Sequence, residues 1–417
     1  MMDTKITAHR VLYFLFLGAF FAMPLGTSPF TILGICILIV WFATGQFIKS
    51  RKQIMRARWL LPVAAIVILS WVGLIWSTDP GGLGLKYAEK THYWLYTVVL
   101  AGMGLSEKAS EHMMRAFFLG LLLNAFVAFL QVARIVPTFG VWGQAFYTGF
   151  YSGYNTLAIL LILGMLAVSF YFRYAKGRKE RILYGCILII YFIHFVLLWS
   201  RGAYLTFILL SPMIAHNMLF GKRILFIFLA YVLLIGAMFA SPVVQDRVRF
   251  SIKAAQSFFK EGGAFTSGKR YSPQIDRVYM WRWAFDLFRA HPLLGVGTGG
   301  YYKAILQKGG EEGIAHPHNN VLYVAVSYGV LGVLVFGWFF WVLFKAGWQN
   351  RHHPLGFFIL SSVLVLLVGG MTNTHILDSG GAFLLSVTAG LVSALPNRGS
   401  WYLRGENPVF IRHDQGH

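Results

Sequence analysis

The chain has 417 residues, of which 57% are hydrophobic and 12% charged, and its formal net charge is +21. Soluble globular proteins carry about 25% charged residues, so this composition excludes an ordinary water-soluble domain and predicts a membrane protein. A basic balance is also typical of nucleic-acid-binding proteins. Here, however, the positive residues lie in short clusters between apolar runs, so we expect no nucleic-acid partner. The two cysteines, Cys36 and Cys186, lie inside apolar runs and exclude a disulfide framework.

Twelve apolar segments follow one another along the chain. Most of them have about the 20 residues that an α-helix needs to cross a bilayer. We therefore expect an all-α polytopic membrane protein with about 12 transmembrane helices and no cleavable signal peptide. The predicted spans are residues 9–26, 29–48, 59–76, 92–105, 113–133, 155–173, 182–200, 202–220, 223–241, 320–344, 355–371 and 380–396.

The short loops between these spans differ in charge from one side of the membrane to the other. Lys and Arg gather in every second loop, at 51–58, 173–181, 222–223 and 345–351, whereas the opposite short loops hold few of them. Because such clusters mark cytoplasmic loops, we expect both termini in the cytoplasm, including a cytoplasmic tail over 397–417.

Residues 242–319 form a long polar segment with eleven Lys and Arg residues on the outer side. The predicted division is therefore nine transmembrane helices over 1–241, a long periplasmic loop over 242–319, and three transmembrane helices over 320–396. Ordered long loops are usually functional. Aromatic and aliphatic residues at helical spacing predict an amphipathic helix near 275–290, which Pro292 ends.

A His-Pro-His-Asn run, His316 to Asn319, directly precedes the tenth span. We place His318 and Asn319 in the first turn of that helix, where free N–H groups and the helix dipole disfavour an imidazolium. A neutral histidine can accept a proton, so His318 is a candidate general base. Two alternatives remain open: His318 or Asn319 caps the helix, or the His-x-His pair binds a metal ion, although no third ligand lies at a suggestive spacing.

Several arginines are candidate phosphate ligands, because the planar guanidinium makes bidentate hydrogen bonds to phosphate. Arg201 lies in Trp199-Ser200-Arg201-Gly202, where two spans meet almost without a loop. Either the arginine has a functional role, or its side chain extends to the lipid headgroups. In the long loop, Arg270, Arg277 and Arg282 either hold a diphosphate or form a solvated, headgroup-binding charge run.

Two further patterns favour structural interpretations. Gly295–Gly300 matches the G-x-G-x-x-G spacing, but no strand precedes it and no βαβ unit surrounds it, so we expect a chain-redirecting turn and no dinucleotide site. The outer loop 134–155 is rich in glycine and in aromatic residues such as Trp142, for which an interfacial belt is preferred over a sugar site.

Three of these elements together resemble the bacterial O-antigen ligases and their polymerase relatives. The first is Ser200-Arg201-Gly202, and the second is the run from Arg277 to Gly297, which includes Trp281 and Pro292-Leu293-Leu294-Gly295. The third is His318-Asn319 followed by Gly329 and Gly332. They occur in the order of the family, and the resemblance is close over roughly 200–335.

The resemblance implies an enzyme of the bacterial inner membrane that works on its periplasmic face. It would transfer O-antigen from undecaprenyl diphosphate to a hydroxyl of the lipid A–core oligosaccharide, without a cofactor or a metal ion. His318 would be the general base, and Arg201 and Arg277 would bind and stabilise the diphosphate. Arg270, Arg282, His316 and Asn319 are further candidate substrate ligands. Besides these two substrates, we expect only membrane lipids as partners.

Three other functions compete with this interpretation. An O-antigen polymerase or a protein O-oligosaccharyltransferase would use the same donor, although the short tail disfavours the latter. Twelve spans are also common among transporters, but the apolar segments contain few ionisable residues and no clear inverted repeat.

Overall fold

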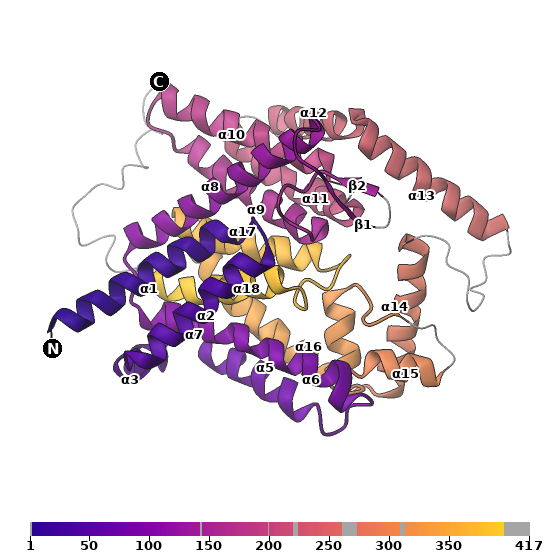
Figure 1. The fold of residues 1–417 in the computed structure, drawn as a ribbon. Helices are drawn as coiled ribbons and strands as arrows, with labels where there is room; N and C mark the ends of the chain where they lie inside the picture. The colour runs from indigo at the N-terminus through magenta and orange to yellow at the C-terminus, as the bar shows by residue number, and fades with distance from the viewer. Residues whose placement is uncertain are drawn as a thin grey trace.

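The computed structural model of the chain describes residues 2–141, 144–198, 200–219, 224–260, 273–308 and 313–395. Trp142, Trp199, Arg270, the loop cluster 222–223 and the tail 397–417 lie outside these described residues. Within them the protein is almost entirely helical (Figure 1).

Each of the twelve predicted spans coincides with a helix. These helices are α1 (Met2–Ala22), α2 (Thr27–Ala43), α5 (Leu60–Val72), α7 (Trp94–Gly102), α8 (Glu107–Val132), α9 (Tyr154–Arg173), α10 (Arg178–Leu197), α11 (Arg201–Met218), α12 (Ile224–Ala240), α16 (Asn320–Gln349), α17 (Pro354–Gly369) and α18 (Ser379–Leu391).

Length and composition separate these helices into two groups. Among the described residues, α8, α9, α10 and α16 are long and apolar enough to cross a membrane alone. The bent pair α12–α13 would make a fifth. Of the others, α1 and α11 have 21 and 18 residues but are not among the helices that qualify, and the rest are shorter than 18 residues. A membrane protein is therefore well supported, whereas twelve spans and the orientation of the loops remain predictions.

The remaining elements are shorter or lie between the apolar helices. They are α3 (Gln46–Lys49), α4 (Arg51–Ile54), η1 (Pro80–Gly84), α6 (Leu85–Glu89), η2 (Lys90–Tyr93), β1 (Phe139–Val141), β2 (Gln144–Phe146), α13 (Pro242–Lys260), α14 (Pro273–Ala290), α15 (Tyr301–Gln307) and η3 (Val392–Ala394). The strands β1 and β2 pair antiparallel inside the aromatic loop 134–155, with Phe139 opposite Phe146.

Helix α9 lies at the centre of the larger core. Its residues from Thr156 to Phe170 are buried, and it packs against α8, α10, α11 and α17. A helix that is apolar on all sides is stable only when other helices or lipid surround it completely. The apolar sequence of α9 therefore accounts for its central place.

The long loop is more helical than the sequence predicted. The expected amphipathic helix is α14, which ends at Ala290, two residues before Pro292, so this prediction is confirmed. Helix α13 was not predicted: it follows α12 after a bend of 76° and carries its charged and apolar residues on different faces. A second, smaller core joins α14 and α15 to the start of α16, through residues such as Leu287, Tyr301 and Val326.

The glycine run after α14 is a tight turn, as the sequence predicted. Gly297 has φ 82°, and a Cβ atom there would lie 2.4 Å from the Cα atom of Ser77. The amide of Thr298 donates to the carbonyl of Gly73 (3.1 Å), and Val296 donates to the carbonyl of Val326 (2.8 Å). Close backbone contact therefore ties this turn to the segment after α5 on one side and to α16 on the other.

Gly329 marks a kink inside α16. Its backbone is non-helical (φ 64°, ψ −157°), and a Cβ atom there would lie 2.3 Å from the carbonyl carbon of Leu293. The freed amide of Val330 donates to the carbonyl of Pro292 at 2.8 Å. Two of the sequence elements behind the family resemblance are thus packed directly against each other.

Candidate active site

Helix α14 places one arginine over the His-Pro-His-Asn turn and leaves another in solvent. Arg277, Trp281 and Ala284 lie on one face, at the i, i+4, i+7 spacing. The indole Nε1 of Trp281 donates to the carbonyl of Pro317 at 2.9 Å, which fixes this face against the turn. Arg282 is exposed on another side of α14, and Arg270 lies outside the described residues, so the structure adds only Arg277 to the site.

The turn itself differs from the predicted helix start. Helix α16 begins at Asn320, and Asn319 is its N-cap: Asn319 Oδ1 accepts from the amide of Leu322 at 3.0 Å. Its Nδ2 donates to the carbonyl of Met371 at 3.0 Å. The placement of His318 in the first helical turn was wrong, because the capping bond needs an extended backbone at Asn319 and leaves His318 before the helix.

His318 adopts the left-handed backbone conformation, with φ 49°. For a residue with a Cβ atom this costs of order 1 kcal/mol, so the surroundings must hold it there. The amide of His318 donates to Nδ1 of His316 at 3.3 Å, and the two imidazole rings lie 4.4 Å apart between centroids. His316 thus supports the turn from within.

The loop between α17 and α18 supplies residues that sequence reasoning missed. Asn373 Oδ1 lies 3.0 Å from His318 Nδ1, and Asn373 Nδ2 donates to Asp378 Oδ2 at 3.4 Å. The same carboxylate oxygen lies 3.3 Å from His375 Nδ1 and accepts from Thr156 Oγ1 at 3.2 Å. One signal was available: Asp378 is the single acidic residue between positions 313 and 405, and it lies in a polar loop between two apolar runs.

These contacts determine which nitrogen of His318 carries the proton. Asp378 accepts from the amide group of Asn373, which leaves the Asn373 carbonyl oxygen facing His318. A carbonyl oxygen can only accept, so Nδ1 of His318 carries the hydrogen. The lone pair of the neutral ring is then on Nε2, the nitrogen that can take a proton from a substrate.

Burial keeps both histidines of the turn neutral. It lowers the pKa of His316 to about 3, and the nearby His318 adds to the shift. Burial also lowers the pKa of His318, the hydrogen bond that its ring donates to Asn373 opposes this shift, and the charge of Arg277 lowers the pKa further. The sequence analysis predicted correctly that the charged form of His318 is disfavoured. It attributed this effect to the helix terminus, whereas the causes are burial and the charge of Arg277.

Arg277 lines a narrow cavity beside Asn373 and His375. Its burial lowers the pKa of its guanidinium, and within the described parts of the chain no carboxylate forms a salt bridge with it. A buried cation without a carboxylate is costly unless an anion joins it. Arg277 is therefore suited to bind a negatively charged ligand, but the cavity of about 10 Å³ has room for only about one water molecule and must widen to admit such a ligand.

The Ser-Arg-Gly element borders the same cavity, but its arginine points elsewhere. Ser200 and Gly202 line the cavity, and a Cβ atom on Gly202 would lie 2.3 Å from Thr372 Oγ1. Arg201 donates from Nη1 to Ser251 Oγ in α13 at 2.8 Å, and its guanidinium carbon lies 5.9 Å from the centre of the Phe250 ring. Arg201 therefore connects α11 to α13 at the rim of the site.

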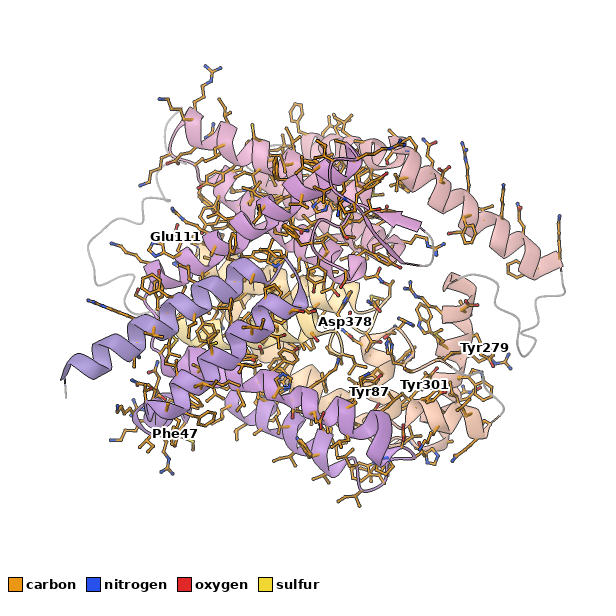
Figure 2. All side chains as sticks on the ribbon, viewed as in Figure 1. Phe47, Tyr87, Glu111, Tyr279, Tyr301 and Asp378 are labelled. Carbon is orange, nitrogen blue, oxygen red and sulfur yellow. The ribbon has the colours of Figure 1, made fainter. Side chains whose placement is uncertain are left out.

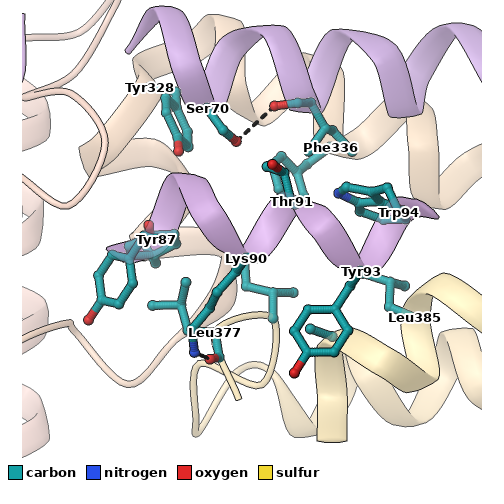
Figure 3. A pocket seen from close by; sticks show the side chains of 14 residues that line it. Ser70, Tyr87, Lys90, Thr91, Tyr93, Trp94, Tyr328, Phe336, Leu377 and Leu385 are labelled. Carbon is teal, nitrogen blue, oxygen red and sulfur yellow. Dashed lines mark hydrogen bonds between the residues drawn. The ribbon is translucent and has the colours of Figure 1, made fainter. Parts of the chain in front are cut away.

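Lys90 approaches the same loop from η2. Its ammonium donates to the carbonyl of Leu377, next to Asp378 (Figure 3). Burial lowers the pKa of Lys90, and the charge of Asp378 opposes this shift. The cavity around Lys90 has about 60 Å³, which is room for a few water molecules and too little for a sugar. Lys90 is thus an anchor of the loop that carries Asn373.

Residues 186–337 match the family model described as O-antigen ligase. Over this segment the chain is similar to the O-antigen ligase family. The matched segment contains Arg201, Arg277 and His318, whereas Asn373 and Asp378 lie beyond it. No curated protein matches the chain. This similarity supports a glycosyltransferase of the ligase or polymerase type.

Proposed function

We propose that this protein transfers O-antigen from undecaprenyl diphosphate to a hydroxyl of the lipid A–core oligosaccharide. The observation that carries the proposal is the proximity of two partly buried groups, His318 and Arg277, close enough for the charge of Arg277 to lower the pKa of His318. Neutral His318 presents its Nε2 lone pair, and Arg277 lacks a carboxylate partner among the described residues. One group can remove a proton, and the other can hold an anion.

These two groups have complementary roles in the transfer. His318 Nε2 takes the proton of the acceptor hydroxyl, and the hydroxyl oxygen forms a bond to the anomeric carbon of the donor. The bond between that carbon and the diphosphate oxygen breaks, and the diphosphate leaves with the electron pair. Arg277 stabilises its growing charge inside a site of low dielectric constant. Direct attack of this kind inverts the anomeric carbon.

The other residues of the site support this step. Arg201 at the rim, which donates to Ser251, is the second candidate ligand of the diphosphate, because its planar guanidinium can make paired hydrogen bonds to phosphate. Asn373 orients His318, and Asp378 orients Asn373. The proposed transfer uses no metal ion, because arginines supply the positive charge at the diphosphate.

The site is proposed to face the periplasm, with both termini in the cytoplasm of a bacterial inner-membrane protein. The distribution of Lys and Arg over the short loops supports this orientation. The activated donor supplies the free energy of the transfer, so no nucleotide is needed on that face.

The identity of the acceptor is tested by reconstitution. Purified protein in liposomes is incubated with undecaprenyl-diphosphate-linked O-antigen and lipopolysaccharide that carries only the core, and products are separated on a gel. We expect a ladder of glycan lengths attached to lipid A–core. Longer chains that remain on undecaprenyl diphosphate would instead establish a polymerase.

A further inference from the structure

A third cavity is lined by residues of α1, the α3–α4 segment and α7. Figure 1 shows α3 at the end of the molecule that bears the N-terminus, away from α14 and α15. The volume of this cavity is about 500 Å³, within the range of small-molecule sites. The lining residues come from α1, from the α3–α4 segment and from the end of α7: His9, Arg10, Gln46, Lys49, Ser50, Gln53 and Gly102.

The lining of this cavity is basic and polar. It includes two permanent cations, Arg10 and Lys49, and within the described residues it contains no carboxylate. His9 Nε2 lies 2.8 Å from the carbonyl of Met103, which accepts its hydrogen. Gln46, a residue that is only 8% exposed, adds an uncharged polar side chain to the lining. Two cations with amide groups beside them and no carboxylate in the lining are suited to hold an anion.

An apolar strip on α2 leads to the cavity. Ile32, Ile35, Ile39 and Phe42 are exposed and recur at intervals of three and four residues, so they share one face of the helix. At the end of this face the rings of Phe42 and Phe47 lie 5.7 Å apart, and Figure 2 shows Phe47 at the same end of the molecule. Acyl chains fit such a strip when a headgroup occupies the cavity beyond it.

We propose that this cavity binds the phosphate of an anionic glycerophospholipid, with the acyl chains of that lipid along the exposed strip of α2. Basic pockets between membrane helices are a recurrent type of lipid headgroup site. The site lies apart from His318 and Arg277, and it does not depend on the glycan-transfer proposal. The same recognition chemistry would suit a free phosphate ester, so the experiment includes both sources.

The test uses the full chain in an uncharged detergent and counts bound lipid by native mass spectrometry. Three ligands are titrated separately: phosphatidylglycerol, phosphatidylcholine and glycerol 3-phosphate. The variant is Arg10→Gln combined with Lys49→Gln, and its matched control is Arg51→Gln combined with Lys52→Gln. The control removes the same charge from two exposed residues of the same end that do not line the cavity.

We expect phosphatidylglycerol to bind wild-type protein in preference to phosphatidylcholine, and glycerol 3-phosphate not to displace it at equal concentration. The cavity variant should bind phosphatidylglycerol roughly tenfold to thirtyfold more weakly, from the loss of two cations near the headgroup. The control should bind within about twofold of wild type.

Three results would overturn the proposal: an equal loss in the control, unchanged binding by the cavity variant, or full displacement by glycerol 3-phosphate. If the double variant does not fold, Gln46→Leu keeps the size of the side chain and removes its amide. This variant should also bind phosphatidylglycerol more weakly, and wild-type affinity would count against the site.

Discussion

The side chain of His318 has a neighbour that determines which of its nitrogens accepts a proton. Asn373 Oδ1 faces Nδ1 of His318 at 3.0 Å, and a change of Asn373 to Asp adds a negative charge at that point. The added charge favours the imidazolium and raises the pKa of His318. A general base works only when neutral, so activity should be lost at a higher pH than in wild type.

For Asn373→Asp we therefore expect the acidic limb of the pH–rate profile to move upward by about one pH unit or more. The rate on the alkaline plateau should stay close to that of wild type, because His318 is neutral there in both proteins. Asn373→Leu, which cannot orient the ring, should instead lower the plateau. An unmoved acidic limb in Asn373→Asp would show that His318 does not control the profile.

Arg277 is proposed to hold the diphosphate through its planar fork. Arg277→Lys keeps the charge and loses the paired hydrogen bonds, so kcat/KM should fall by roughly a hundredfold. The matched change Arg282→Lys alters an exposed arginine of the same helix and should leave the rate nearly unchanged. Equal losses in the two variants would mean that the position of Arg277 at the cavity gives its guanidinium no special role.

The proposed transfer without a metal ion predicts how the enzyme responds to a chelator. Because arginines supply the positive charge at the diphosphate, EDTA in the reconstituted assay should leave the initial rate unchanged. A loss of activity that added Mg²⁺ or Mn²⁺ restores would contradict the assignment of this role to arginine.

At the scale of elements, the kink of α16 depends on Gly329. A Cβ atom there would meet the backbone of Leu293 at 2.3 Å in a conformation with positive φ. Gly329→Ala should therefore destabilise the protein by at least about 2 kcal/mol, measured as thermal unfolding in detergent. Gly337→Ala in the same helix meets nothing within 4 Å and should be neutral or stabilising by up to about 1 kcal/mol. Similar unfolding temperatures for the two variants would refute the packing role of Gly329.

The sequence was sufficient to predict elements whose signal is local. Long apolar runs predicted all twelve helices of the apolar set, because twenty apolar residues are stable only inside lipid or a core. The period of its apolar residues predicted α14. Helix α13 was missed since its many charges suggested a loop, and only the separation of its charged and apolar faces indicates a helix.

The candidate site was predictable only in part, because part of it arises from tertiary contact. His318 and Asn373 are 55 residues apart, and nothing local links the two positions. The left-handed conformation of His318 is uncommon for a residue other than glycine. A helical turn was therefore expected there instead. Arg201 was singled out correctly as lying at the junction before α11, but its contact with α13 required the fold.

At the scale of the whole molecule, the two ends of the bundle differ in chemistry. Asp378 and the cluster around it lie towards α14, whereas Phe47 lies at the opposite end (Figure 2). This separation is consistent with one end facing the periplasm and the other the cytoplasm, which is the orientation that the loop charges predict.

Cysteine labelling in intact cells tests this orientation. In a variant that lacks Cys36 and Cys186, single cysteines replace the exposed residues Lys179 and Lys308. A maleimide that crosses the outer membrane but not the inner one should label position 308 and leave position 179 unlabelled until the cells are lysed. The reverse pattern would invert the topology and place His318 on the cytoplasmic side.

The most direct measurement of the central claim compares two histidine variants in the reconstituted transfer assay. His318→Asn removes the base and keeps a residue type that tolerates positive φ, whereas His291→Asn changes an exposed histidine after α14. We expect His291→Asn to produce the lipid A–core ladder at the wild-type rate and His318→Asn to be slower by at least about a hundredfold, with unchanged thermal unfolding. A ladder formed at the wild-type rate by His318→Asn would contradict the assignment of His318 as the general base of a glycan ligase.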